Sequence, residues 1–317
     1  MTPVSRTRTD RAALRTRHNT ALASVGTDSI GAMRSSNALD REWFSHNGHR
    51  TFELANRLYD MAATGMPTVA RIHDQRSEAQ FIATWPKDTL VHRLARMAAH
   101  DMYYDEADAT PSTWEVRDRS APGEVRTVRY MSVTVALRHY GLERGDDSFD
   151  VPRTLDADEV CHDYFVNEVM WSAPYEQLLG TMADEVFHTV FPYRTMLYNL
   201  NWIAATLVSE LDAEMCSEEP EVASLFARPG RLKRRTIPEW AQRAVFFRDQ
   251  GHCTYCRRDL TGLLNAMSKE NYDHMVPLAE GGLNDVTNLQ LLCSECNSKK
   301  SAKIIEPSNQ YIRWFTP

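Results

Sequence analysis

The chain has 317 residues, 43% of them hydrophobic and 25% charged, a composition that is ordinary for a globular protein and allows two domains. It contains no apolar run of about eighteen residues and no apolar core of a secretory signal, so we expect neither a membrane-spanning helix nor a membrane partner. The net charge of −7 hides an asymmetry: residues 228–317 carry 14 Lys and Arg against 9 Asp and Glu, whereas residues 1–227 carry a net −12.

Residues 1–40 carry several arginines among serine, threonine and alanine, with weak hydrophobic periodicity. This pattern predicts a basic, flexible arm. An organelle transit peptide has a similar composition, but Asp10 and Asp28 count against that interpretation.

Residues 41–215 have patterns typical of a mainly helical domain. Apolar residues at helical spacing predict one helix over 51–63 and another after Asp88, which can cap it. Polar and apolar residues alternate over 114–128 around a Pro-Gly turn, which predicts a hairpin, and a third element follows over about 130–140.

Three further helices are predicted in the same domain. The first opens near Asp156, the second has Pro174 at its start, and the third follows a break at Pro192. The net negative charge of residues 1–227 argues against this domain being the main nucleic-acid-binding surface, because a nucleic acid is a polyanion and is repelled by negative charge. We expect instead a regulatory role, with a protein partner or an oligomer contact through this acidic helical domain.

Two Glu-x-x-His pairs lie on these predicted helices. Ferritin-like di-iron proteins use such pairs with further glutamates, for which Glu168 and Glu210 are candidates. Chance alone accounts for about one such pair in a chain of this composition, so we interpret the pairs as neighbours on helix surfaces and keep an N-terminal metal site as an alternative. The pairs are Glu159 with His162 and Glu185 with His188.

An acidic stretch at 214–221 and a basic run at 228–235 together predict a linker over 216–236. A solvated linker and a phosphate contact both explain the basic run, and we leave both open. Pro238 then begins a predicted helix that runs to about Gln250. We expect four of its apolar residues to face inward: Trp240, Ala244, Val245 and Phe247.

Four of the six cysteines form two Cys-x-x-Cys pairs. Thiolates at this spacing predict one tetrahedral zinc ion per chain, a closed structural site without an open position for a catalytic water. The two other cysteines, Cys161 and Cys216, stand alone, so the chain fits a reducing, cytoplasmic compartment rather than a disulfide framework. The predicted zinc ligands are Cys253, Cys256, Cys293 and Cys296.

The segment between the pairs holds a second polar motif. It reads Asp273-His274-Met-Val-Pro277, then Gly281-Gly282, then Asn288-Leu-Gln-Leu-Leu, and Asn297 and a lysine-rich tail follow the last cysteine. Two short strands and a helix after the second pair are expected. This combination resembles the HNH endonuclease family over residues from about 238 to 303, which implies a ββα-metal fold.

The helical patterns of residues 41–215 and this resemblance together predict a fold class of α+β multidomain: a mainly α-helical N-terminal domain, and the small zinc-stapled ββα-metal domain that the resemblance implies. We place the nuclease domain at 237–306 and a tail at 307–317.

The resemblance also implies roles for the matching residues. His274 corresponds to the general base, and Asn288 to the residue that positions the histidine-bearing strand. Asp273 and Asn297 correspond to the ligands of one catalytic Mg²⁺ or similar divalent ion, with Asn297 at a position where the family often has histidine. Candidate nucleic-acid contacts are Arg257, Arg258, Lys299, Lys300 and Lys303.

The sequence therefore predicts a metal-dependent HNH endonuclease that hydrolyses phosphodiester bonds of DNA, with RNA not excluded. Restriction or anti-phage defence is a setting in which the family occurs. The alternative is a non-catalytic, zinc-dependent nucleic-acid-binding or regulatory protein.

Overall fold

The computed structural model describes residues 46–65, 82–107, 112–117, 125–142, 157–210, 220–262 and 270–313. All of these residues belong to one compact unit. We call the described part of 46–210 the helical region and the described part of 220–313 the C-terminal region. No helix in these ranges is both long and apolar enough to cross a membrane. The predicted basic arm lies outside the described residues.

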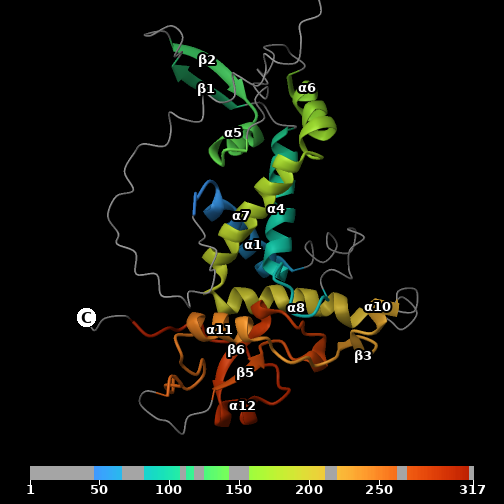
Figure 1. Cartoon of the computed structure of the whole chain (residues 1–317), viewed down its shortest axis with the longest axis vertical. Coiled ribbons are helices and arrows are strands. Elements are labelled where there is room, and N and C mark those ends of the chain that lie inside the picture. The colour runs from blue at the N-terminus through green and yellow to red at the C-terminus, as the bar shows by residue number, and fades with distance from the viewer. Residues whose placement is uncertain are drawn as a thin grey trace, which may run out of the picture. The chain divides into compact units, whose positions relative to one another are not determined.

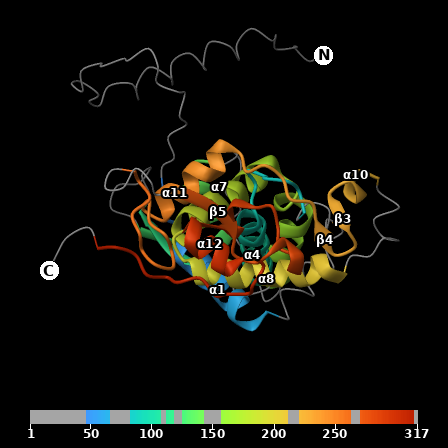
Figure 2. The same ribbon diagram turned by 90° about the horizontal axis from the view of Figure 1, so that it is seen from below.

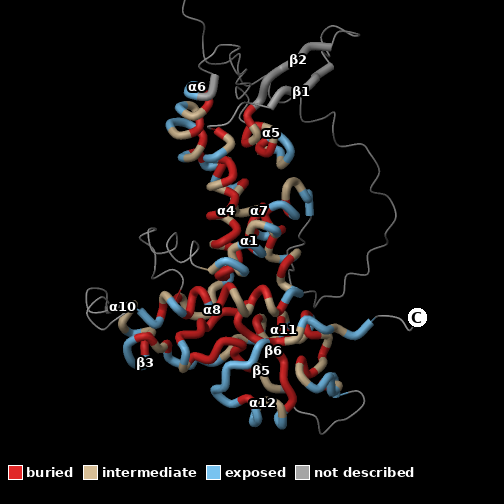
Figure 3. Tube along the Cα trace, turned by 180° about the vertical axis from the view of Figure 1, so that it is seen from behind, coloured by how far each residue is buried: buried red, intermediate tan, exposed pale blue. Residues whose placement is uncertain are grey.

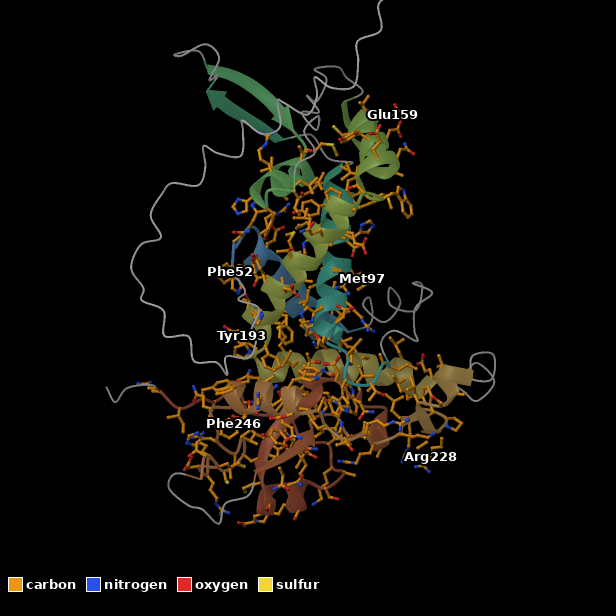
Figure 4. All side chains as sticks on the ribbon, in the orientation of Figure 1. Phe52, Met97, Glu159, Tyr193, Arg228 and Phe246 are labelled. Carbon is orange, nitrogen blue, oxygen red and sulfur yellow. The ribbon has the colours of Figure 1, made fainter. Side chains whose placement is uncertain are left out.

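The helical region buries one apolar face of each of its four longest helices. Leu54 and Leu58 are fully buried, as the helical spacing predicts, whereas Phe52 is exposed (Figure 4). The four helices pack against one another (Figure 1), and they are α1 (Thr51–Thr64), α4 (Leu90–Ala107), α7 (Ala173–Val190) and α8 (Arg194–Glu210).

Shorter elements complete the helical region. The predicted hairpin is confirmed, since β1 (Ser112–Arg117) and β2 (Val125–Tyr130) pair antiparallel, and its turn lies outside the described residues. The element after it is helix α5 (Ser132–His139). Helix α6 (Ala157–Tyr164) continues into one π-helical turn, η1 (Phe165–Val169).

The start of α4 is capped from the other end of the chain. We predicted Asp88 as the cap, but its carboxylate pairs with Arg93 and Arg96 at 3.2 and 2.5 Å. The backbone N–H of Leu90 donates instead to Asp285 Oδ2 at 2.9 Å. A carboxylate at this position also complements the positive end of the helix dipole.

The C-terminal region is built from short elements around one small sheet. Strands β5 and β6 pair antiparallel, α12 packs against both, and α11 packs on β6. Figure 2 shows α12 beside β5. Strand β6 is buried along its whole length (Figure 3). The elements are α10 (Pro220–Ala223), β3 (Phe226–Arg228), β4 (Arg231–Leu232), α11 (Glu239–Arg248), β5 (Glu270–His274), η2 (Leu278–Glu280), η3 (Val286–Asn288), β6 (Leu289–Cys293) and α12 (Ser294–Lys300).

Helix α11 begins after Pro238 as predicted, but one of its inward-facing residues was assigned wrongly. Phe247 is 76% exposed. The buried face of α11 consists of Ala241, Val245 and Arg248, which helical periodicity places together.

The two regions share one apolar core and several buried hydrogen bonds. Met275, Leu278 and Leu283 belong to the same buried cluster as the helices of the helical region. At Gly281, with φ of 80°, an added Cβ would lie 2.5 Å from the carbonyl oxygen of Ala205 in α8. Only glycine allows the loop to approach α8 this closely.

A buried arginine ties three separated segments together at the same junction. Arg194 is 1% exposed, and its Nη1 lies 2.9 Å from Asp249 Oδ1 at the end of α11. Its other nitrogens donate to the carbonyl oxygens of Ser308 and Gln310 at 2.6 and 2.8 Å. The ring of Tyr311 lies 4.0 Å from the guanidinium carbon. The end of the described chain is therefore fastened across the start of α8.

Candidate functional site

The four predicted cysteine ligands converge. Their sulfur atoms all lie within 4.8 Å of one another, and Cys256 Sγ is 3.7 Å from Cys293 Sγ. Zinc–sulfur bonds of about 2.3 Å in a tetrahedron require sulfur–sulfur separations of about 3.8 Å. The site can therefore hold a zinc ion.

Backbone hydrogen bonds place the two cysteine pairs. In the first pair, the N–H of Cys253 donates to the carbonyl of Arg258, and the N–H of Arg257 donates back to Cys253. Thr254 N–H donates to the carbonyl of Leu291 at 3.0 Å, which joins this turn to β6. The second pair spans the end of β6 and the first turn of α12. The backbone bond from Thr254 to β6 thus holds together cysteines that are far apart in sequence.

Asp273, His274 and Asn297 line one cleft of about 600 Å³. Asp273 and His274 are the last two residues of β5, opposite Gln290 and Leu289 of β6. Asn297 reaches the cleft from α12. Two short elements separated in sequence therefore present a carboxylate, an imidazole and an amide to the same space.

Lys300 is part of this site rather than a surface residue. Its side chain is 1% exposed, and its Nζ lies 2.8 Å from Asp273 Oδ2 and 2.8 Å from the carbonyl oxygen of His274. Gln290 Nε2 is 3.4 Å from the same carboxylate oxygen. The ammonium ion therefore holds α12 against the end of β5 and neutralises Asp273.

His274 is 1% exposed, and neither ring nitrogen has a partner with good hydrogen-bond geometry among the described residues. Burial lowers the pKa of His274 to about 3, and the positive charges of Arg234 and Lys300 act in the same direction. The side chain of Asn284 opposes this shift by favouring the protonated ring. The imidazole is neutral at physiological pH and retains an unused lone pair.

Trp85, from the segment before α4, packs beside His274. The two ring centroids are 5.9 Å apart. The backbone N–H of Trp85 donates to the carbonyl of Asn284 at 2.8 Å, and Trp85 adopts a positive φ of 51°. The indole Nε1 and Asn284 Oδ1 are buried without partners. The helical region thus supplies one wall around the histidine.

Asn288 is fully buried and pins the loop that follows His274. Its Oδ1 accepts from the N–H of Val276 at 2.8 Å. Its Nδ2 donates to the carbonyls of Val276 and Leu283, both at 3.0 Å. The side chain is too far inside the protein to react, and its bonds hold the end of β5 in place.

The remaining predicted contact residues lie on the surface near the cysteines. Arg258 and Lys299 both pair with Glu295, at 3.2 and 2.6 Å. Arg257 and Lys303 are exposed. None of these four lines the cleft, and Lys300 is the one predicted contact residue that does.

Three arginines line the cleft without having been assigned to it: Arg228, Arg231 and Arg234. The sequence of this basic run predicts either a solvated linker or a phosphate contact, and it does not choose between them. The chain folds there into the β3–β4 hairpin. Trp85 and Asn284 had no detectable signal, since both act through the tertiary structure.

The Glu-x-x-His pairs do not form a metal site in the part of the chain that the structure describes. There, the four cysteines are the only group of three or more His, Cys, Asp or Glu residues able to share an ion. We expected Glu185 on a helix surface, and this expectation is wrong. It is fully buried and accepts hydrogen bonds from Thr51, Tyr140 and the backbone of Asn47 and Gly48.

Comparison with known proteins agrees with this geometry over one segment. No curated protein and no solved structure matches the chain. Residues 253–303, from the first cysteine to the end of the lysine-rich tail, match the family model described as HNH endonuclease. The C-terminal region therefore carries an HNH endonuclease domain, and the helical region has no recognised family.

Proposed function

We propose that the protein is a metal-dependent endonuclease that hydrolyses phosphodiester bonds of DNA. The observation that carries this proposal is the cleft in which Asp273, His274 and Asn297 meet inside the segment that matches the HNH family. Its basic lining favours a polyanionic substrate. RNA offers the same phosphodiester chemistry and is a second substrate to be tested. Restriction or anti-phage defence in the cytoplasm is the setting we propose.

His274 is the proposed general base. A neutral imidazole accepts a proton from the water that attacks phosphorus, while the bond from phosphorus to the 3′ oxygen breaks. Burial, with the charges of Arg234 and Lys300, lowers the pKa of His274, which keeps the ring unprotonated but also weakens it as a base. The ring must therefore become more exposed when substrate binds. Asn288 acts as a positioning residue, because its three hydrogen bonds hold the loop after His274.

Asp273 and Asn297 are the proposed ligands of a divalent ion such as Mg²⁺. Carboxylate and amide oxygens suit a hard cation, and both side chains line the same cleft. Lys300 already bonds to Asp273 Oδ2, so the ammonium and the ion would share one carboxylate. When bound, the ion would stabilise negative charge on the phosphate and the leaving oxygen. The cysteine-bound zinc is proposed to be structural.

The burial of His274 sets a condition for activity. A base that is 1% exposed cannot reach a water on the scissile phosphate until the side chains around it move. Trp85 is the first candidate, because its ring lies against the imidazole and its backbone has a strained φ. We expect substrate binding to displace it.

The test uses the full chain with supercoiled plasmid and Mg²⁺ or Mn²⁺. We expect nicking or cutting by the wild type, and at least a 100-fold loss for His274→Ala, the usual contribution of a general base. His188→Ala is the matched control, since His188 is exposed on α7. Zinc content and thermal unfolding of each variant show that it is folded.

Trp85→Ala belongs to the same experiment, because a covered histidine offers a reason for an inactive wild type. If neither the wild type nor Trp85→Ala cuts DNA or RNA, or if His274→Ala cuts equally well, the proposal is wrong. The full chain is required. A fragment that begins at Arg228 would expose Met275, Leu278 and Leu283, which are buried against the helical region.

A further inference from the structure

The β3–β4 hairpin brings three arginines to the cleft from outside the segment that matches the HNH family. Arg228 ends β3, Arg231 begins β4, and Arg234 lies two residues after the end of β4 (Figure 4 labels Arg228). All three line the same cleft as His274. The family match begins at residue 253, so this wall of the cleft lies outside the matched segment.

The hairpin is held rigidly on the rest of the protein. Phe226 and Leu232 are buried in the core shared with the helices. Gly230, with φ of 70°, lies so close to α8 that an added Cβ would be 3.0 Å from the carbonyl oxygen of Ser209. Asn284 Nδ2 donates to the carbonyl of Lys233 at 2.8 Å. The backbone that carries the arginines is therefore fixed beside the site.

The charges on this wall have no ion-pair partner among the described residues. Within the described residues, no ion pair involves Arg228, Arg231 or Arg234. Asp273 is the only acidic residue among those that line the cleft, and it is paired with Lys300. The cleft therefore presents three uncompensated positive charges.

Two of these charges face each other across the hairpin. Arg228 and Arg231 are register partners. Like charges directly opposite on paired strands are destabilising. A bound polyanion between them would relieve this repulsion, and guanidinium groups match phosphate oxygens in geometry.

We propose that Arg228, Arg231 and Arg234 bind the phosphodiester backbone of the nucleic-acid strand that enters the cleft. Contacts of this kind fix the register of the strand beside His274 and do not read its sequence. The proposal rests on the proposed function for the identity of the substrate. An acidic peptide is the other polyanion that would fit three arginines, and the experiment separates the two.

The experiment measures binding without cleavage. The full chain with His274→Ala is titrated into a fluorescent DNA duplex without added divalent ions, at 50–200 mM salt. The slope of log affinity against log salt falls by about 0.9 for each phosphate contact removed. We expect the magnitude of this slope to fall by about 0.9 in each single variant, Arg228→Ala, Arg231→Ala and Arg234→Ala, and by about 2.7 in the triple variant. The loss should be the same for unrelated duplex sequences.

Two control variants test whether position and charge matter. Arg243→Ala removes an exposed arginine of α11 that pairs with Glu239, so its slope should equal that of the parent. Arg→Lys at the three positions keeps the point charges, so most of the slope should return. Zinc content and thermal unfolding of each variant show whether it is folded.

Three results would overturn the inference: an unchanged slope in the folded triple variant, an equal loss in Arg243→Ala, or competition by polyglutamate as effective as by DNA. The proposed function fails independently of these results. A protein that binds DNA through the three arginines but never cuts it supports this inference and contradicts the nuclease. A protein that cuts DNA, and whose triple variant keeps the salt slope of the parent, supports the nuclease and contradicts this inference.

Discussion

The helical region and the C-terminal region are stabilised in different ways. The helical region buries long apolar faces, such as those of α4 and α7, against each other. The C-terminal region has strands of at most five residues, together with a cluster of four cysteines that could hold zinc and several buried polar side chains. Short elements bury too little apolar surface to be stable alone. The proposed catalytic side chains therefore lie in a region whose short elements pack against the helical region and surround the four cysteines.

Loss of the proposed zinc site should produce the largest difference in stability between the two regions. Structural zinc contributes about 10–16 kcal/mol in zinc-finger peptides, so we expect Cys293→Ser to abolish zinc binding and unfold residues 253–303. Hydrogen exchange should show α1, α4 and α7 still protected. Cys161→Ala, a buried cysteine of α6, is the matched control and should keep its zinc. Full zinc content in Cys293→Ser would contradict the assignment.

Arg194 tests whether the regions unfold together. Replacing it by Met leaves Asp249 without one of its two buried arginine partners, which we expect to lower the free energy of unfolding by about 3–5 kcal/mol. Urea unfolding followed by both circular dichroism and zinc release measures this. Arg243→Ala breaks an exposed pair with Glu239 and should cost less than about 1 kcal/mol. Equal effects of the two variants would mean that the buried junction is not a strong link.

Asn288→Ala tests how much one buried polar side chain contributes to the stability of the C-terminal region. It leaves the N–H and carbonyl of Val276 and the carbonyl of Leu283 without their buried partner. We expect a loss of about 3 kcal/mol in stability, because each buried polar group left unsatisfied costs about 1–3 kcal/mol. Hydrogen exchange at Val276 should accelerate while α4 stays protected. Unchanged exchange at Val276 would show that the amide does not hold this loop.

His92 is expected to make the stability of the helical region depend on pH. Burial lowers the pKa of His92 to about 4, and Arg96 among other charges acts in the same direction, while Asp88 opposes it. The unfolded chain takes up this proton near pH 6.5 and the folded chain only near pH 4, so stability falls as the pH drops through this window. At 1.36 kcal/mol per pKa unit, His92 alone should cost about 2 kcal/mol between pH 7 and pH 5.

The measurement for His92 is a difference between two proteins. Urea unfolding of the wild type and of His92→Gln at pH 7 and pH 5 isolates the contribution of this ring from those of other histidines. We expect the variant to lose about 2 kcal/mol less than the wild type over this interval. Identical losses would mean that His92 is protonated alike in both states.

Local patterns predicted much of the fold. Apolar spacing located α1 and α4, alternation around a Pro-Gly turn located β1 and β2, and Pro174 and Pro192 marked helix boundaries. The same local logic failed where a partner lies far away in sequence. Asp88 has the chemistry of a helix cap, but Asp285 reaches the start of α4 instead. Phe247 is apolar, yet its position on α11 turns it toward solvent.

The sequence by itself located the cysteine cluster and the residues of the proposed site, because metal ligands and a general base need particular residue types at short spacings. The two Cys-x-x-Cys pairs, Asp273, His274 and Asn288 were identified in this way. Only the tertiary structure decided their surroundings. It buried Lys300 against Asp273, placed Trp85 beside His274, and brought the arginine hairpin to the cleft. Those contacts join segments separated by tens to hundreds of residues, and packing of the shared core, which no local pattern encodes, brings them together.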